Sequence, residues 1–107
     1  MLVLLDHGTP RGLARFLVGH VVKTAQRQGW DRLINGDLLA QAEAAGFQVL
    51  VTPDKNIRYQ QNLAKRKMAI VVIGNPLWPI LRLHCQMVGS AVDAARPGSY
   101  TEVDIPS

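Results

Sequence analysis

The sequence predicts an α/β fold, a three-layer α/β/α sandwich around a mostly parallel sheet. Two observations carry this prediction. Apolar runs of strand length alternate with segments of helical periodicity along the chain. The run at residues 70–73 is continuously apolar, as is typical of a strand covered by helices on both faces. A length of 107 residues suits one domain, residues 1–107, because a second core needs roughly another hundred residues.

The first half of the chain predicts two strands and a helix between them. Residues 3–5 form an apolar run that ends in the turn Asp6-His7-Gly8. Thr9 and Pro10 are typical of a helix N-cap and a first helical residue. The expected helix places three apolar residues on one face, Leu13, Phe16 and Leu17, and residues 20–25 predict the second strand.

The second half continues the alternation. Asn35 is expected to cap a helix whose apolar positions are Leu38, Leu39, Ala42 and Ala45. Strands are expected at 48–52 and 68–73, and Asn56 is a candidate cap for a short polar helix at 57–64. Residues 79–95 predict one long helix, with core positions Ile80, Leu83, Met87, Val88, Ala91 and Ala95. Residues 99–105 are more polar and predict an edge strand.

The charge distribution is one-sided. Twelve Lys and Arg face eight Asp and Glu, and no acid lies between Lys55 and Val92. Such a stretch suits a polyanion, either nucleic acid or an acidic partner protein, although a solvated basic face has the same composition. No apolar run has the roughly 20 residues of a membrane helix, so no membrane partner is expected. A single cysteine, Cys85, fits a reducing cytoplasm.

Three acids are candidates for a metal site. Asp6 and Asp54 follow predicted strands, and Asp37 lies in the first turn of the helix before the second of these strands. Ligands of open α/β sheets bind beyond the carboxyl ends of the strands, and carboxylates that converge there suit Mg²⁺ or Mn²⁺. Each acid also has a structural alternative: Asp6 and Asp54 can accept backbone N–H groups in turns, and Asp37 can stabilise a helix dipole.

Several segments resemble the PIN-like domains of the DUF5615 family. They are Leu-Leu-Asp-His-Gly-Thr-Pro at 4–10, Asn-Gly-Asp-Leu-Leu at 35–39 and Gly-Phe-Gln-Val-Leu-Val-Thr-Pro-Asp-Lys-Asn at 46–56. The likeness covers about residues 2–82. It implies a PIN-type α/β/α sandwich in which Asp6, Asp37 and Asp54 hold divalent metal and hydrolyse an RNA phosphodiester.

Two positions depart from that family. Many members have Glu where this chain has His7, and many have a second Asp where it has Asn56. Asn56 can ligate through its carbonyl oxygen but adds no charge. His7 can act as a proton shuttle beside the metal or can have a purely structural role. These departures put two-metal catalysis in doubt and leave single-metal or lost activity open.

The sequence therefore leaves three functions as alternatives. The first is a Mg²⁺- or Mn²⁺-dependent ribonuclease, the toxin of a toxin–antitoxin pair, which holds RNA with Lys55, Arg58 and Arg66. The second is a catalytically weakened module that binds RNA or a protein such as an antitoxin. The third and weakest is a receiver-like signalling domain, which lacks the expected acidic pair and late lysine. Surplus apolar residues on the last helix predict a homodimer or antitoxin surface: Leu77, Trp78, Leu81 and Cys85.

Overall fold

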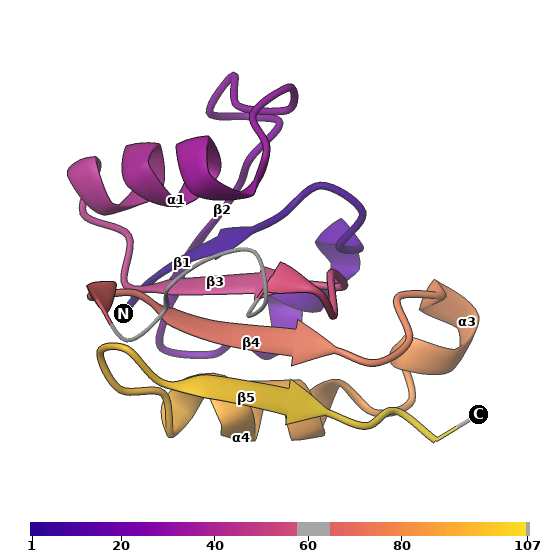
Figure 1. Ribbon diagram of the computed structural model, residues 1–107. Helices are drawn as coiled ribbons and strands as arrows, with labels where there is room; N and C mark the ends of the chain where they lie inside the picture. Colours follow the sequence, from indigo (N-terminus) through magenta and orange to yellow (C-terminus); the bar gives the residue numbers. More distant parts are fainter. Residues whose placement is uncertain (58–64, 107) are drawn as a thin grey trace.

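The computed structural model describes residues 1–57 and 65–106, and in them the chain forms one five-stranded sheet (Figure 1). All neighbouring strands are parallel, in the order β2-β1-β3-β4-β5. This confirms the predicted α/β class. The strands are β1 (Leu2–Leu5), β2 (Val21–Thr24), β3 (Val49–Thr52), β4 (Ala69–Ile73) and β5 (Tyr100–Val103).

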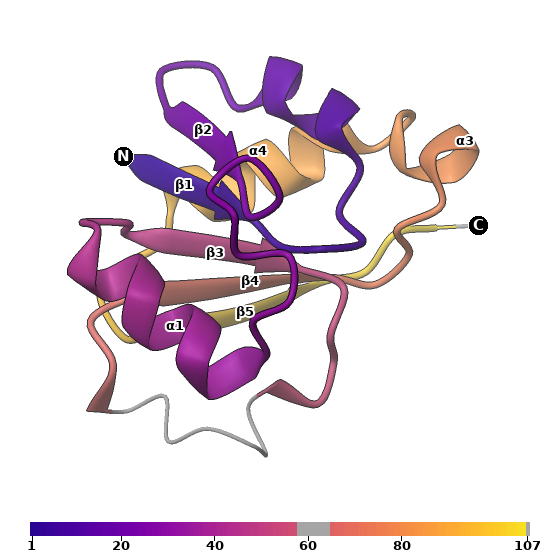
Figure 2. The ribbon, with the colours of Figure 1, turned by 90° about the horizontal axis from the view of Figure 1, so that it is seen from above.

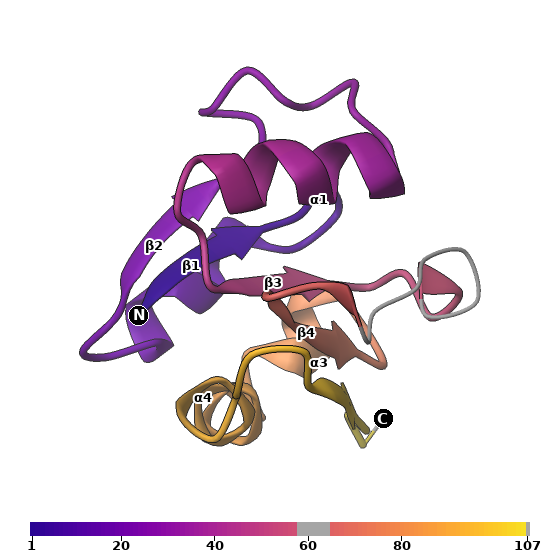
Figure 3. The same ribbon diagram turned by 60° about the vertical axis from the view of Figure 1, so that its left-hand side comes forward.

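Helices cover both faces of this sheet, which gives the three expected layers (Figures 2 and 3). The helix α1 (Asn35–Ala44) lies on one face, while α4 (Cys85–Asp93) lies on the other with the 3-10 helix η1 (Arg11–Phe16). Along β1, Val3 and Leu5 point into the core under α4, and Leu4 points into the core under α1. All three are fully buried, so the strand needs apolar residues at consecutive positions.

The first predicted helix is a short 3-10 turn instead. Pro10 occupies the N-cap position of η1 and no side-chain hydrogen bond caps it. The Thr9 hydroxyl instead donates to the carbonyl oxygen of Val51 at 3.1 Å. Leu13 and Leu17 are buried as expected, but Phe16, the last residue of the 3-10 helix, is exposed.

The long helix expected at 79–95 is two helices. The chain breaks between α3 (Trp78–Leu81) and α4, which changes the phase of the buried face. Leu83 and Met87, predicted in the core, are exposed, while Val88 is buried as predicted. Ile80, Ala91 and Ala95 are partly buried against the core. The fully buried residues of this region also include Leu81, Cys85 and Val92.

Two smaller expectations about helix ends are corrected or lie outside the description. The N-cap residue of α1 is Ile34, so Asn35 is the first helical residue, and Ala45 is an exposed C-cap residue. The helix predicted at 57–64 lies outside the described residues except for Ile57, which is fully buried. None of the helices in the described part of the chain has the length and apolar character needed to span a membrane.

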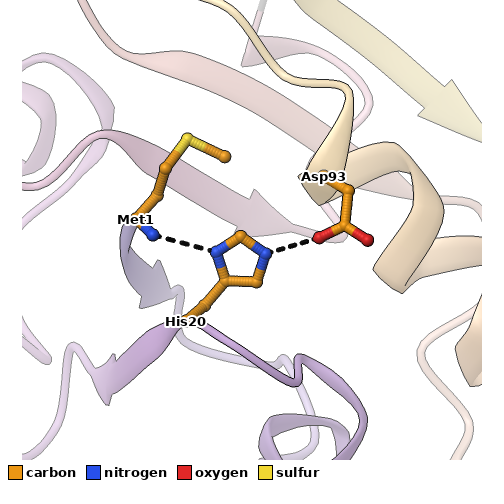
Figure 4. A network of polar contacts seen from close by, with 3 residues as sticks. All are labelled: Met1, His20 and Asp93. Atoms are coloured by element: carbon orange, nitrogen blue, oxygen red, sulfur yellow. Dashed lines mark hydrogen bonds and ion pairs between the residues drawn. The ribbon is translucent and has the colours of Figure 1, made fainter.

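A polar network ties the amino-terminal end of the sheet together (Figure 4). His20 lies just before β2, and its Nδ1 is 3.0 Å from the Met1 amino group. Its Nε2 is 2.6 Å from Oδ1 of Asp93, the last residue of α4. This histidine therefore links the starts of two strands to the end of a helix.

Candidate functional site

Two aspartates and a threonine meet at the carboxyl ends of β1 and β3. Asp6 directly follows β1, and Thr52, the last residue of β3, is fully buried. The Thr52 hydroxyl donates to Oδ2 of Asp6 at 2.7 Å and accepts the backbone N–H of Asp54 at 3.1 Å. The neighbouring parallel strands thus bring two acids that are 48 positions apart to one edge, as the sequence predicted.

Both carboxylates also accept backbone N–H groups from the residues that follow them. His7 donates its N–H to Oδ1 of Asp6 at 2.7 Å, and Asn56 donates its N–H to Oδ1 of Asp54 at 2.9 Å. These are the turn roles that the structural alternative predicted. His7 and Asn56 therefore contribute main-chain donors here, and both residues are exposed.

The pKa of Asp6 is raised above its ordinary value of 3.8. Burial of the carboxyl group is the largest cause, because desolvation disfavours the charged form. The hydrogen bonds from Thr52 and from the His7 backbone oppose this shift and lower the pKa, whereas the nearby charge of Asp54 raises it further. A cation bound here would offset the cost of desolvating the Asp6 carboxylate and would reduce its repulsion by Asp54.

A hollow of about 360 Å³ opens beside Asp6. It is enclosed by the loop that follows β1, by Arg11 at the start of η1, and by the end of β2 at Thr24 and Gln26. Asp6 is the one acid among its lining residues, so the carboxylate lies at the wall of a small, mostly polar space.

The third predicted ligand stands apart from this pair. Asp37 is exposed in the first turn of α1, which is the position of a helix-dipole acid. It is not among the groups that shift the pKa of Asp6. In residues 1–57 and 65–106, no three His, Cys, Asp or Glu side chains form a group that could hold a metal ion. The three-carboxylate cluster is therefore not assembled in this part of the chain.

The structure describes two of the three residues predicted to hold RNA, and these two have different surroundings. Lys55 is exposed close to Asp54 in the sequence, and it lines a small hollow with Glu102 and Asp104. Arg66 is half-buried, with Nη1 3.8 Å from Oε1 of Glu43. Arg58 lies outside the described residues.

The predicted apolar interface is also largely internal. Leu81 and Cys85 belong to the core, and Trp78 packs against it. Burial raises the pKa of the Cys85 thiol, whose Sγ donates to the carbonyl oxygen of Leu81 at 3.4 Å. Leu77 is exposed. A surplus of apolar surface was predicted because residues 79–95 were expected to form one uninterrupted helix, whereas the region forms α3 and α4.

Sequence reasoning missed two residues of this edge. Thr52 joins the two aspartates, and its only sequence signal was its place between an apolar run and Pro53-Asp54. Arg11 lines the hollow beside Asp6 because η1 starts there, and nothing in its sequence context distinguished it. In comparisons with known proteins, the chain matches no family model, no curated protein and no solved structure.

Proposed function

We propose that this protein hydrolyses RNA phosphodiesters with a divalent metal ion held by Asp6 and Asp54. The observation that carries the proposal is the Asp6–Thr52–Asp54 arrangement at adjacent strand ends, in which one hydroxyl donates to the Asp6 carboxylate and accepts the backbone N–H of Asp54. It lies beside a hollow where a substrate can approach. The choice of RNA, and of a toxin controlled by an antitoxin protein, rests on the resemblance to the PIN-like family.

The donor set fits Mg²⁺ or Mn²⁺ as a two-carboxylate site. Protein-bound Mg²⁺ often has one or two carboxylates, with water and substrate phosphate oxygens at its other positions. A bound ion would supply charge neutralisation at the phosphate and a more acidic water. A pair of carboxylates does not offer the charge for two ions, which agrees with the neutral Asn56.

The chain's own residues have distinct parts in this proposal. Thr52 orients Asp6 by donating to Oδ2, so that Oδ1 remains near the turn. The pKa of Asp6 is raised chiefly because burial destabilises its ionised form. A bound cation would stabilise that ionised form. The His7 side chain lines the hollow and is exposed, where it can transfer a proton to or from water.

Three Asp→Asn variants test the proposal with a fluorescent single-stranded RNA in Mn²⁺. Asp6→Asn and Asp54→Asn should each lower the cleavage rate by more than about 100-fold, because each loses a ligand charge. Asp31→Asn, an exposed acid outside the hollow, is the matched control and should cleave at the parent rate. Equal rates in all preparations would identify a contaminant and reject the proposal.

Asp37→Asn decides between two and three ligands. A rate near that of the parent would support the two-carboxylate site. A loss equal to that of Asp6→Asn would show that Asp37 joins the site when substrate and metal are present.

The second candidate function is RNA or protein binding without hydrolysis. The separation of Asp37 from the other two acids favours it, as do the neutral residues His7 and Asn56. Calorimetric titration with Mn²⁺ separates the candidates. Heat that disappears in Asp54→Asn supports the metal site, and the absence of heat in the parent protein supports the binding module.

A further inference from the structure

A second hollow adjoins the one beside Asp6 and is lined by cations. It has a volume of about 450 Å³, and its charged lining residues are Arg11, Lys23 and Arg27. Arg11 and Thr24 line both hollows, so the two spaces lie side by side along the end of β2. We call the two hollows together the trough: Lys23 and Arg27 line one hollow, Asp6 lines the other, and Arg11 lines both.

Separate local structures hold the three cations at this place. Arg11 begins η1, and Lys23 is an exposed residue of the edge strand β2. Arg27 lies in the turn after β2, where its backbone N–H donates to the Thr24 hydroxyl at 3.2 Å. Gln28 closes the same turn with a 3.2 Å hydrogen bond to the Thr24 carbonyl oxygen. The backbone that carries the trough is therefore held by a strand and its hydrogen-bonded turn.

The cations have no acidic partner in the described part of the chain. The ion pairs there are those of His20 with Asp93 and of Arg66 with Glu43, and neither involves the trough. No acid lines the 450 Å³ hollow. Three unpaired cations around one hollow raise the local concentration of an anion, and they suit successive phosphates of a chain.

We propose that the trough formed by Arg11, Lys23 and Arg27 binds the phosphodiester backbone of single-stranded nucleic acid. Each hollow has the volume of a small-ligand site. A single strand is flexible enough to place successive phosphates along both hollows. The proposal deepens the proposed function, because the bound strand leads directly to Asp6. It places the strand over the β2 side of the sheet and not over Lys55 and Arg66.

Two triple variants with equal net charge test this placement. One neutralises the trough with Arg11→Gln, Lys23→Gln and Arg27→Gln. The matched control neutralises one lysine and two arginines that are exposed elsewhere, Lys65, Arg82 and Arg96. Both triples carry Asp6→Asn and are kept in EDTA, so that binding is measured without hydrolysis, and thermal unfolding confirms that each is folded.

Fluorescence anisotropy with single-stranded RNA and DNA of about 20 nucleotides, at roughly 50 to 200 mM salt, gives the affinity and its salt dependence. Each lost phosphate contact lowers the slope of log K against log salt by about 0.7 on a single strand. The trough triple should therefore have a slope shallower by about two, equivalent to roughly 100-fold weaker binding at 0.1 M salt. Similar losses with RNA and DNA would indicate backbone recognition, and a loss with RNA alone would add a contact to the 2′-hydroxyl.

Three results would overturn the proposal. They are an equal loss in the control triple, absence of binding by the Asp6→Asn parent at the lowest salt, and tighter binding of polyglutamate than of RNA at the trough. The last result would identify an acidic protein as the partner. Trough-dependent RNA binding in a protein that shows no metal-dependent cleavage would refute the proposed hydrolysis and leave the trough established.

Discussion

The carboxylates at the two ends of the sheet have opposite kinds of neighbours. At the amino-terminal end, Asp93 accepts a hydrogen bond from His20, whose other nitrogen faces the Met1 amino group, so groups of opposite character alternate (Figure 4). At the carboxyl end, Asp6 and Asp54 lie near each other and neither forms an ion pair with a described residue. In the described part of the chain, the hydrogen-bond donors to that second pair are one hydroxyl and two backbone N–H groups.

The difference separates a structural cluster from a candidate functional one. Polar groups that serve only the fold are usually matched by their neighbours. A half-buried carboxylate with a raised pKa beside a second carboxylate opposes folding, and such groups concentrate at functional sites. The same Asp→Asn substitution should therefore change the stability of the protein in opposite directions at the two ends of the sheet.

The largest effect is expected from Thr52→Val. This change removes the donor to Asp6 and leaves the Asp54 backbone N–H without its acceptor, which should lower the free energy of unfolding by about 2 kcal/mol. Thr9→Val is the matched control, because Thr9 is also buried at this edge but donates only to the Val51 carbonyl oxygen. Its expected loss is about 1 kcal/mol in urea unfolding.

Thr52→Val and Thr9→Val should also differ in their effect on the pKa of Asp6. Without the Thr52 hydrogen bond, the pKa of Asp6 should rise further, so the acidic limb of the cleavage pH profile should move to higher pH. Thr9→Val should leave that limb in place. A shift of equal size in both variants would contradict the role given to Thr52.

The next effect is stabilisation by metal. If Asp6 and Asp54 bind Mg²⁺ with a Kd on the order of 1 mM, then about 10 mM Mg²⁺ should stabilise the folded protein by about 1.4 kcal/mol. Thermal unfolding should show the increase in the parent and in Asp93→Asn, and none in Asp6→Asn. An equal increase in all three proteins would mean that Mg²⁺ acts nonspecifically.

A smaller effect distinguishes the same substitution at the two ends. At neutral pH, Asp6→Asn should raise Tm by about 2 °C, because it removes a desolvated charge and its repulsion with Asp54. Asp93→Asn should lower Tm by about 3 °C, because it weakens the hydrogen bond to His20 on a mostly exposed side chain. Changes of the same sign would remove the contrast between the ends.

The smallest effect concerns pH. Since the folded pKa of Asp6 lies above 3.8, its contribution to stability is fully present below that value and is lost as the pH rises through the raised folded pKa. The Tm advantage of Asp6→Asn over the parent should therefore shrink by about 1 to 2 °C as the pH falls from 7 toward 4. A constant difference would show that Asp6 has an ordinary pKa.

The sheet was the predictable part of this fold. Strands buried on both faces need consecutive apolar residues, and the expected 68–73 differs from the observed Ala69–Ile73 by one residue. The helices were less predictable because their phase depends on where they break. Because the helix breaks after Leu81, Met87 is exposed and Cys85 is buried. Residues 82–84 contain no glycine or proline that would predict this break.

The site was predictable only where topology alone determined it. The parallel ends of β1 and β3 bring Asp6 and Asp54 to one edge, whatever the intervening loops do. The place of Asp37 depends on how α1 sits on the sheet, and that arises from packing, which is not evident in local sequence. The same applies to Arg11, Lys23 and Arg27, which share a hollow only because η1 and β2 adjoin.

The position of β1 has a consequence for how this chain is made. β1 hydrogen-bonds to β2 on one side and to β3 on the other, so this strand of the sheet stays half-paired until residue 52 has emerged from the ribosome. Each pairing also joins segments distant along the chain, which slows folding. During synthesis, Leu2–Leu5 is therefore a partly exposed apolar segment and a site where misassociation can occur, long before Asp6 meets Asp54.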